Sequence, residues 1–232
     1  MTTAVADPLR ADAFSPDAVY AYWDGSGDET ASREIARGRE PIGAALARWA
    51  EAKILVSVSD DRDCFFEGRV GDTATFVAAL QLDGAGTIAR CLSFHAPLVE
   101  PAPAPALPSS HNARAILDRY FLSLTAGDFE AACACFSEDC LYSHPPYSAG
   151  AARAEFRGRA DLLAGFQGVR GARPSRLPRI VCCVQDGTNC FIEGVVDGDP
   201  PRGSFVSSVS LDRDGLIRRY VAFYSDSRVP RL

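Results

Sequence analysis

Hydrophobic residues in the second half of the chain follow first a helical and then a strand-like period. After Asn112, apolar residues recur about every 3.6 positions, which places them on one face of a helix. These residues are Ile116, Leu117, Tyr120, Phe121 and Leu124. Asn112 can cap this helix at its start, and Gly127 suits its end. Asp128 can cap a second helix with its own apolar stripe, so the sequence predicts a helical hairpin.

Beyond the hairpin, the pattern predicts a strand, a third helix and a meander. A short strand is expected at Cys140–Ser143, and the helix from about Arg159 to Phe166 after a loop with Pro145 and Pro146. Four further strands are expected near Ile180–Val184, Cys190–Val196, Ser204–Leu211 and Leu216–Tyr224. Turn signals separate them at Asp186-Gly187, Asp197-Gly198 and Asp214-Gly215. The predicted fold class is α+β, with three helices on one curved antiparallel sheet.

The chain also repeats itself. The stretch 60–68 reads D-D-R-D-C-F-F-E-G, and 186–194 reads D-G-T-N-C-F-I-E-G. Further upstream, residues 14–20 correspond to residues 136–142. Downstream, Arg90 and Phe94 correspond to Arg219 and Phe223. A repeat of this length is larger than a solenoid unit, so each copy is expected to be a domain with its own core. Only 13 residues precede Phe14, so the first copy is expected to lack part of the helical hairpin.

A proline-rich stretch separates the two copies. Residues 98–110 read L-V-E-P-A-P-A-P-A-L-P-S-S, which favours an extended, polyproline-like spacer. The predicted organisation is a truncated domain at 1–97, a linker at 98–111 and a complete domain at 112–232.

Composition excludes several classes of function. The formal net charge is −6, and Lys53 is the only lysine, so nucleic acid is not an expected partner. No apolar run reaches the roughly 20 residues of a membrane span, and the first residues do not resemble a signal peptide, so a cytoplasmic location without membrane contact is expected. The eight cysteines lack the C-x2-C spacing of zinc sites and are expected to pack in cores. Neither a metal nor another cofactor is predicted.

Several motifs together resemble a known family. They are R-Y-F on the first helix, then A-G-D-F, F-S-x-D-C-L-Y-S-H-P and F-R-G-R-A-D-L, followed by four strands. This order is similar to the SnoaL-like branch of the nuclear transport factor 2 (NTF2) superfamily, which includes ketosteroid isomerases and polyketide cyclases. The resemblance covers residues 112–224 and, in shortened form, 14–95. It implies two cone-shaped domains, the first with an incomplete hairpin.

Members of this superfamily usually dimerise by packing their sheets. The resemblance therefore implies that the two copies form an intramolecular pseudo-dimer, with an additional homodimer left open.

The resemblance also implies candidate catalytic residues. Tyr120 matches the helix tyrosine that donates a hydrogen bond to the substrate oxygen in the isomerases. His144 stands before a proline where those enzymes carry an aspartate base, and Ser207 lies near the position of their third residue, an aspartic acid. Independently of the family, an imidazole with a pKa near 6.5 can move protons at neutral pH. A tyrosine hydroxyl can stabilise the enolate that deprotonation of a ketone creates.

Other residues are expected to line the pocket of the second domain. They are Tyr142, Phe121, Phe136, Phe166, Ser207 and Tyr224. For each candidate a structural role stays open: Tyr120 as a core tyrosine, His144 as a loop residue and Tyr224 as sheet packing. Trp23 and Trp49 occur only in the first copy, and each is a candidate to fill the cavity there. Glu67 and Glu193 are expected to face solvent, because polar residues alternate with apolar ones along a half-exposed strand.

The leading functional hypothesis is an enzyme of the isomerase or cyclase type. It would enolise a hydrophobic, ketone-containing substrate in the second cone, with His144 as the base and Tyr120 as the oxyanion donor. The alternative is a non-catalytic cone that binds an apolar ligand or another protein.

Overall fold

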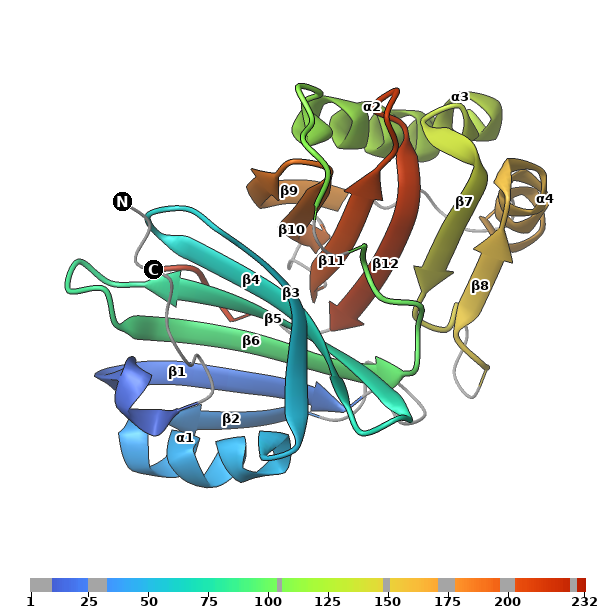
Figure 1. Cartoon of the computed structure of the whole chain (residues 1–232). Coiled ribbons are helices and arrows are strands. Elements are labelled where there is room, and N and C mark those ends of the chain that lie inside the picture. The colour runs from blue at the N-terminus through green and yellow to red at the C-terminus, as the bar shows by residue number, and fades with distance from the viewer. Residues whose placement is uncertain are drawn as a thin grey trace.

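The computed structural model describes residues 10–24, 33–103, 106–147, 151–170, 178–196, 203–225 and 229–232. Two six-stranded sheets follow one another along the chain (Figure 1). The first has the strand order β2-β1-β6-β5-β4-β3 and the second β8-β7-β12-β11-β10-β9. Equivalent strands occupy equivalent places, so the duplication seen in the sequence is a duplication of one fold.

The first half has one α-helix among its described residues. Its elements are the 3-10 turn η1 (Ala11–Ala13), β1 (Phe14–Asp24), β2 (Arg33–Arg37), α1 (Arg39–Leu46), the 3-10 turn η2 (Ala47–Trp49), β3 (Ala52–Ser59), β4 (Asp63–Val70), β5 (Ala74–Leu82) and β6 (Ile88–Pro97). Within the described part of the chain, only η1 precedes β1, so the helical hairpin of the second half has no counterpart there.

The second half contains the predicted helices and strands. Its elements are α2 (Ala113–Ala126), α3 (Phe129–Cys133), β7 (Phe136–His144), β8 (Ala154–Arg157), α4 (Arg159–Arg170), β9 (Pro178–Asp186), β10 (Asn189–Val196), β11 (Gly203–Leu211) and β12 (Ile217–Ser225). The Asn112 side chain accepts a hydrogen bond from the Ala115 amide, and that of Asp128 accepts one from Ala131. Gly127 ends α2 with a φ of 78°. The predicted caps are therefore confirmed.

Some details differ from the prediction. Strand β7 begins at Phe136, four residues earlier than expected, and the short strand β8 was not predicted. Strand β8 has only four residues, of which two are exposed, so it carries little hydrophobic pattern. The turn predicted at Asp197-Gly198 lies outside the described residues.

Each sheet is mixed and not wholly antiparallel, because β1 pairs in parallel with β6 and β7 with β12. The chain order explains this pairing. Helix α4 carries the chain back to its starting side, so β9 runs in the same direction as β8. Three hairpins then reverse the direction three times, which leaves β12 antiparallel to β8 and therefore parallel to β7.

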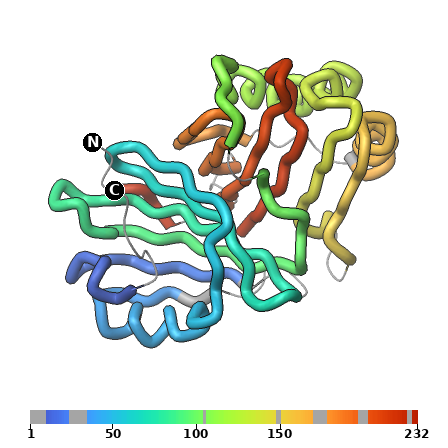
Figure 2. Tube along the Cα trace, viewed as in Figure 1, coloured from blue at the N-terminus to red at the C-terminus, as the bar shows by residue number. Residues whose placement is uncertain are grey.

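The two sheets pack against each other. Figures 1 and 2 show the strands of one sheet crossing those of the other, with α1 and the group α2–α4 on the outer sides. A hydrophobic cluster between the sheets contains residues of both halves, and the rings of Phe65 and Phe191 stack there with centroids 5.8 Å apart. Val99 and Ala102 of the proline-rich stretch are buried in the same cluster. Two other clusters fill the space between each sheet and its own helices.

Two buried ion pairs cross this interface. Arg90 binds Glu193 through both carboxylate oxygens, at 3.0 and 2.6 Å, and Arg219 binds Glu67 at 2.8 Å. The expectation that Glu67 and Glu193 face solvent is wrong, since they are only 1% and 2% exposed. Strand alternation does place them on the face opposite the cone interior, but the other half of the chain covers that face. Removing either partner of such a pair would leave an uncompensated buried charge.

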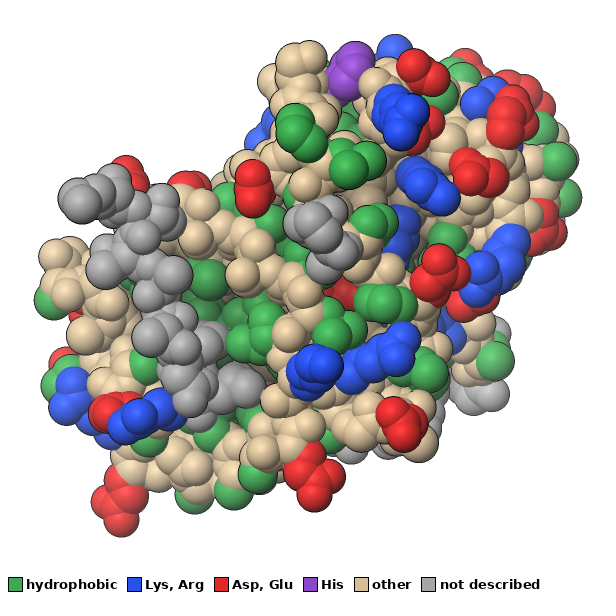
Figure 3. Space-filling model, viewed as in Figure 1, with side chains coloured by type: hydrophobic (Ala, Val, Ile, Leu, Met, Phe, Trp, Pro, Cys, Tyr) green, Lys and Arg blue, Asp and Glu red, His purple; other side chains and the backbone are tan. Residues whose placement is uncertain are grey.

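The surface carries charges of both signs. On the face shown in Figure 3, acidic and basic side chains are interspersed over the second half. Among the described residues, no helix is long and apolar enough to span a membrane.

Candidate active site in the second half

Three tyrosine hydroxyls form a chain inside the second half. Tyr120 projects from α2, Tyr142 from β7, and Tyr147 lies just beyond the end of β7. The Tyr120 hydroxyl lies 3.4 Å from that of Tyr142, which lies 3.2 Å from that of Tyr147. Tyr120 and Tyr142 are buried, whereas Tyr147 is half-buried. The chain therefore leads from the interior toward the surface.

His144 ends strand β7 next to this chain. Its Nδ1 atom lies 2.8 Å from the carbonyl oxygen of Pro145. A carbonyl can only accept a hydrogen bond, so Nδ1 carries the proton in a neutral ring and Nε2 is left as an acceptor. The imidazole is half-buried and stacks on the Tyr147 ring, with the ring centroids 4.5 Å apart and an angle of 4° between the ring planes. This arrangement orients a nitrogen base at the end of the strand.

An aromatic wall continues from Tyr142 to Tyr220 of β12. The rings of these two residues stack with centroids 5.3 Å apart, and Tyr120 meets Tyr220 edge to face at 5.6 Å. Ser207 donates a hydrogen bond of 3.1 Å to the Tyr220 hydroxyl. Ser207 thus reaches the tyrosine cluster through Tyr220. Aromatic pairs of this kind add stabilisation beyond the area they bury.

The structure brings most of the predicted site residues together. Phe136, Phe166 and Phe121 all lie within 6.4 Å of the Tyr120 ring, measured between centroids. His144 is joined to this group through Tyr142, whose ring is parallel to the imidazole at 6.1 Å. Tyr224 is half-buried and packs at the periphery of the same cluster.

Sequence reasoning missed Tyr147 and Tyr220. Tyr220 shares the strand alternation of Tyr224, so counting by two along β12 from Tyr224 finds it. Tyr147 lies in an irregular segment after two prolines, where no periodic pattern predicts the direction of a side chain. Only its position beside His144 distinguishes it.

The hydrophobic cluster that contains Tyr120 and Tyr142 also buries the thiols of Cys133 and Cys140. Burial raises the pKa of the Cys133 thiol to about 12 and that of Cys140 to about 11. A hydroxyl donor acts more strongly on a developing charge in such an environment than in water. Among the residues that the structure describes, no group of three His, Cys, Asp or Glu side chains could hold a metal ion.

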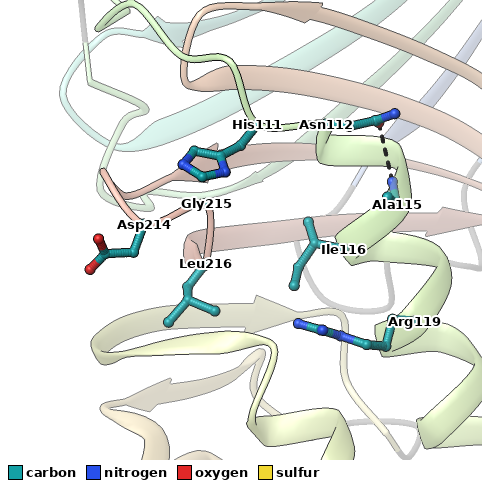
Figure 4. Close-up of a pocket in the computed structure, with 8 residues that line it drawn as sticks. All are labelled: His111, Asn112, Ala115, Ile116, Arg119, Asp214, Gly215 and Leu216. Atoms are coloured by element: carbon teal, nitrogen blue, oxygen red, sulfur yellow. Dashed lines mark hydrogen bonds between the residues drawn. The ribbon is translucent and has the colours of Figure 1, made fainter.

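A separate surface hollow of about 310 Å³ lies between α2 and the β11–β12 turn (Figure 4). Its lining includes Ile116 and Arg119 on one side and His111, Asp214 and Leu216 on the other. None of the predicted site residues belongs to it. The His111 ring packs over Gly215, where a Cβ would meet the ring, and φ at this turn is 78°. The close approach explains the glycine.

The equivalent interior of the first half is filled by a tryptophan. Tyr20 occupies the position of Tyr142, and its hydroxyl accepts hydrogen bonds from Trp49 Nε1 at 2.8 Å and Ser93 at 3.0 Å. The Trp49 ring also packs against Phe76 at 4.8 Å. Of the two candidate tryptophans, Trp49 fills the space, whereas Trp23 lies in the cluster between the sheets. Burial raises the pKa of Tyr20 far above its ordinary value.

Comparison with known proteins yields one family and several solved structures. The SnoaL-like domain family matches residues 117–220. No curated protein sequence matches the chain. Three of the similar crystal structures are a candidate ketosteroid isomerase from Kribbella flavida DSM 17836, an NTF2-like protein of unknown function from Burkholderia xenovorans LB400, and a candidate polyketide cyclase from Sinorhizobium meliloti.

These structures each resemble about half of the chain. The first is 24% identical, with a TM-score of 0.39, and the match covers 52% of this chain and 82% of the other. The second is 19% identical, with a TM-score of 0.39 and coverages of 51% and 87%. The third is 19% identical, with a TM-score of 0.38 and coverages of 48% and 98%.

Proposed function

Because the second half of this chain is a SnoaL-like domain, we propose that its interior binds a hydrophobic, ketone-containing molecule and isomerises or cyclises it through an enolate. The observation that carries this proposal is the chain of hydroxyls from Tyr120 to Tyr147 beside the oriented imidazole of His144. The surrounding rings of Phe136, Phe166 and Tyr220 suit a neutral apolar guest.

In this proposal His144 removes a proton next to the ketone. In this role Nε2 accepts the proton, since Nδ1 is engaged with the carbonyl oxygen of Pro145. The resulting imidazolium keeps the same hydrogen bond, so deprotonation of the substrate requires no rearrangement of the ring. The base can then return the proton to another carbon, as an isomerase requires, or wait while the enolate attacks a second carbonyl and closes a ring.

Tyr120 stabilises the negative charge on the enolate oxygen. Its hydroxyl turns from Tyr142 to the substrate, and the Tyr142 hydroxyl, in contact with Tyr147, can donate to Tyr120 in its place. Hydrogen bonds in such a chain polarise one another, which makes the terminal donor stronger. The buried, apolar surroundings add to the effect.

Hydrogen exchange tests the proposal without knowledge of the final product. The protein is incubated in D₂O with a library of cyclic ketones and polyketide fragments, and deuterium uptake next to the carbonyl is measured by mass spectrometry. We expect catalysed exchange of at least one bound compound, lost in His144→Ala and kept in His111→Ala, which removes a surface histidine. Binding without catalysed exchange would identify a non-catalytic ligand-binding cone.

A further inference from the structure

Two cysteine thiols touch on the inner wall of the second half. The sulfur atoms of Cys183 on β9 and Cys190 on β10 lie 3.5 Å apart. The two residues are diagonal neighbours on adjacent antiparallel strands, since Cys190 is opposite Gln185 and Cys183 is opposite Ile192. Both belong to or pack against the hydrophobic cluster beneath α2. Among the described cysteines, no other sulfur pair has a hydrogen-bonding contact of this kind.

The two thiols differ in accessibility and in acidity. Cys190 is fully buried, whereas Cys183 is partly exposed. The hydrogen bond from Cys190 lowers the pKa of Cys183 below its ordinary value, and Arg114 acts in the same direction against the effect of burial. The same contact, together with burial, raises the pKa of Cys190. A thiolate is the nucleophilic form of cysteine, so Cys183 is the more reactive partner.

We propose that Cys183 and Cys190 form a redox-active dithiol that a hydroperoxide converts into a disulfide between β9 and β10. This inference does not depend on the proposed enolisation chemistry. It concerns thiols that the proposed mechanism does not use.

The reaction balances with a hydroperoxide as the oxidant. The Cys183 thiolate attacks the peroxide oxygen, the O–O bond breaks, and after protonation of the leaving group Cys183 is a sulfenic acid with one water or alcohol released. The Cys190 sulfur then attacks the Cys183 sulfur, its proton passes to the departing hydroxide, and a second water leaves. Two thiols are oxidised by two electrons, and the peroxide is reduced by two.

The fold allows the sulfurs to approach. They are in contact already, and a disulfide requires a separation of about 2.05 Å. Strand β9 is an edge strand of its sheet, and its pairing with β10 is irregular between Glu193 and Gly194. An edge strand with one partner can shift more easily than a central strand that is paired on both sides.

A direct test uses the whole chain. It is treated with hydrogen peroxide, quenched, alkylated without reduction and digested, and the peptides are identified by mass spectrometry. We expect a cross-linked peptide joining Cys183 to Cys190 and the loss of two titratable thiols, both reversed by dithiothreitol.

Variants separate this pair from general oxidation. Cys183→Ser should lose the cross-link, and it removes a partly exposed side chain, so folding should survive. Cys182→Ser is the matched control, because Cys182 is the sequence neighbour of Cys183 but packs against the interface cluster, where burial raises the pKa of its thiol to about 12. The control should oxidise like the parent. Overoxidation of Cys183 without a cross-link, or equal thiol loss in Cys183→Ser, would overturn the inference.

Discussion

At the scale of single residues, the candidate site depends on hydroxyl and imidazole groups whose partners are already in place. Tyr142 is the centre of the arrangement, since its hydroxyl contacts those of Tyr120 and Tyr147 and its ring stacks on Tyr220. Its aromatic body and its hydroxyl have separate roles. A substitution that removes only the hydroxyl can therefore distinguish packing from chemistry.

Tyr142→Phe should keep ligand binding but lower catalysed ketone exchange by about tenfold, less than the roughly 100- to 1000-fold of a direct oxyanion donor, because Tyr142 acts through Tyr120. The free energy of unfolding should fall by about 1 kcal/mol, the usual net value of a buried hydrogen bond. Deuterium uptake and denaturant unfolding measure the two effects. Tyr224→Phe, at the periphery, is the control. Unchanged exchange in Tyr142→Phe would remove the hydroxyl chain from the mechanism.

Buried thiols predict a loss of stability in alkali. Burial raises the pKa of Cys133 from its ordinary value of 9.0 to about 12. A raised pKa means that the stabilisation is complete below pH 9 and is lost as the pH rises toward 12, since the unfolded thiol ionises first. Between pH 7 and pH 10 this thiol should account for a loss on the order of 1 kcal/mol. Denaturant unfolding at both pH values should show a smaller difference for Cys133→Ala than for the parent.

At the scale of elements, one turn attaches the proline-rich stretch to the second sheet. Gly187, in the β9–β10 turn, has a φ of 55° and packs on the carbonyl of Leu107. The neighbouring Thr188 amide donates to the Leu107 oxygen at 2.8 Å, and the Leu107 amide donates to the Thr188 hydroxyl at 3.0 Å. The turn thus needs glycine for two separate reasons, its conformation and its close contact.

A pair of glycine substitutions separates these reasons. Gly71 has nearly the same φ, 57°, but no atom lies within 4 Å of the position that a Cβ would take. Gly71→Ala should lower the free energy of unfolding by only about 1–2 kcal/mol, the cost of a left-handed conformation. Gly187→Ala should cost clearly more, because its Cβ would overlap the Leu107 carbonyl. Equal losses of unfolding free energy in the two variants, measured by denaturant unfolding, would show that the backbone at Leu107 can move away from the added Cβ at no cost.

At the scale of the whole molecule, the two halves are joined by a core with buried charges. The arrangement is nearly symmetric: Arg90 also donates to the carbonyl of Val229, and Arg219 to that of Glu100. Near the end of the chain, Arg231 binds Glu193 and Asp63, so the last residues bridge both halves. With Trp49 filling its interior, we expect the first half to act as the structural partner of the second.

Glu193→Gln should destabilise the whole chain by about 3–5 kcal/mol, because Arg90 would keep its charge in a buried site. Both halves should unfold together in one transition, so unfolding curves recorded by fluorescence and by circular dichroism should coincide. Asp118→Asn removes the exposed pair with Arg114 and should change stability by less than about 0.5 kcal/mol. Two separate transitions in the parent protein would contradict the coupling of the halves.

The sequence by itself determined the local structure and the duplication. The caps at Asn112 and Asp128, the turn at Gly215 and the strand periods all arise from residues close together in the chain, and each was predictable for that reason. Site residues in regular elements, such as Tyr120 and Ser207, could be placed on a face but not paired with a partner.

Only the tertiary structure decided what covers each face. A glutamate in a strand alternates in the same way whether water or another sheet lies beyond it, so the burial of Glu67 and Glu193 could not be read from the pattern. The same holds for the contacts between Tyr120 and Tyr142, Ser207 and Tyr220, and Cys183 and Cys190. These contacts depend on how helices and strands pack in three dimensions, and that packing is set by the burial of the whole chain and not by any one segment.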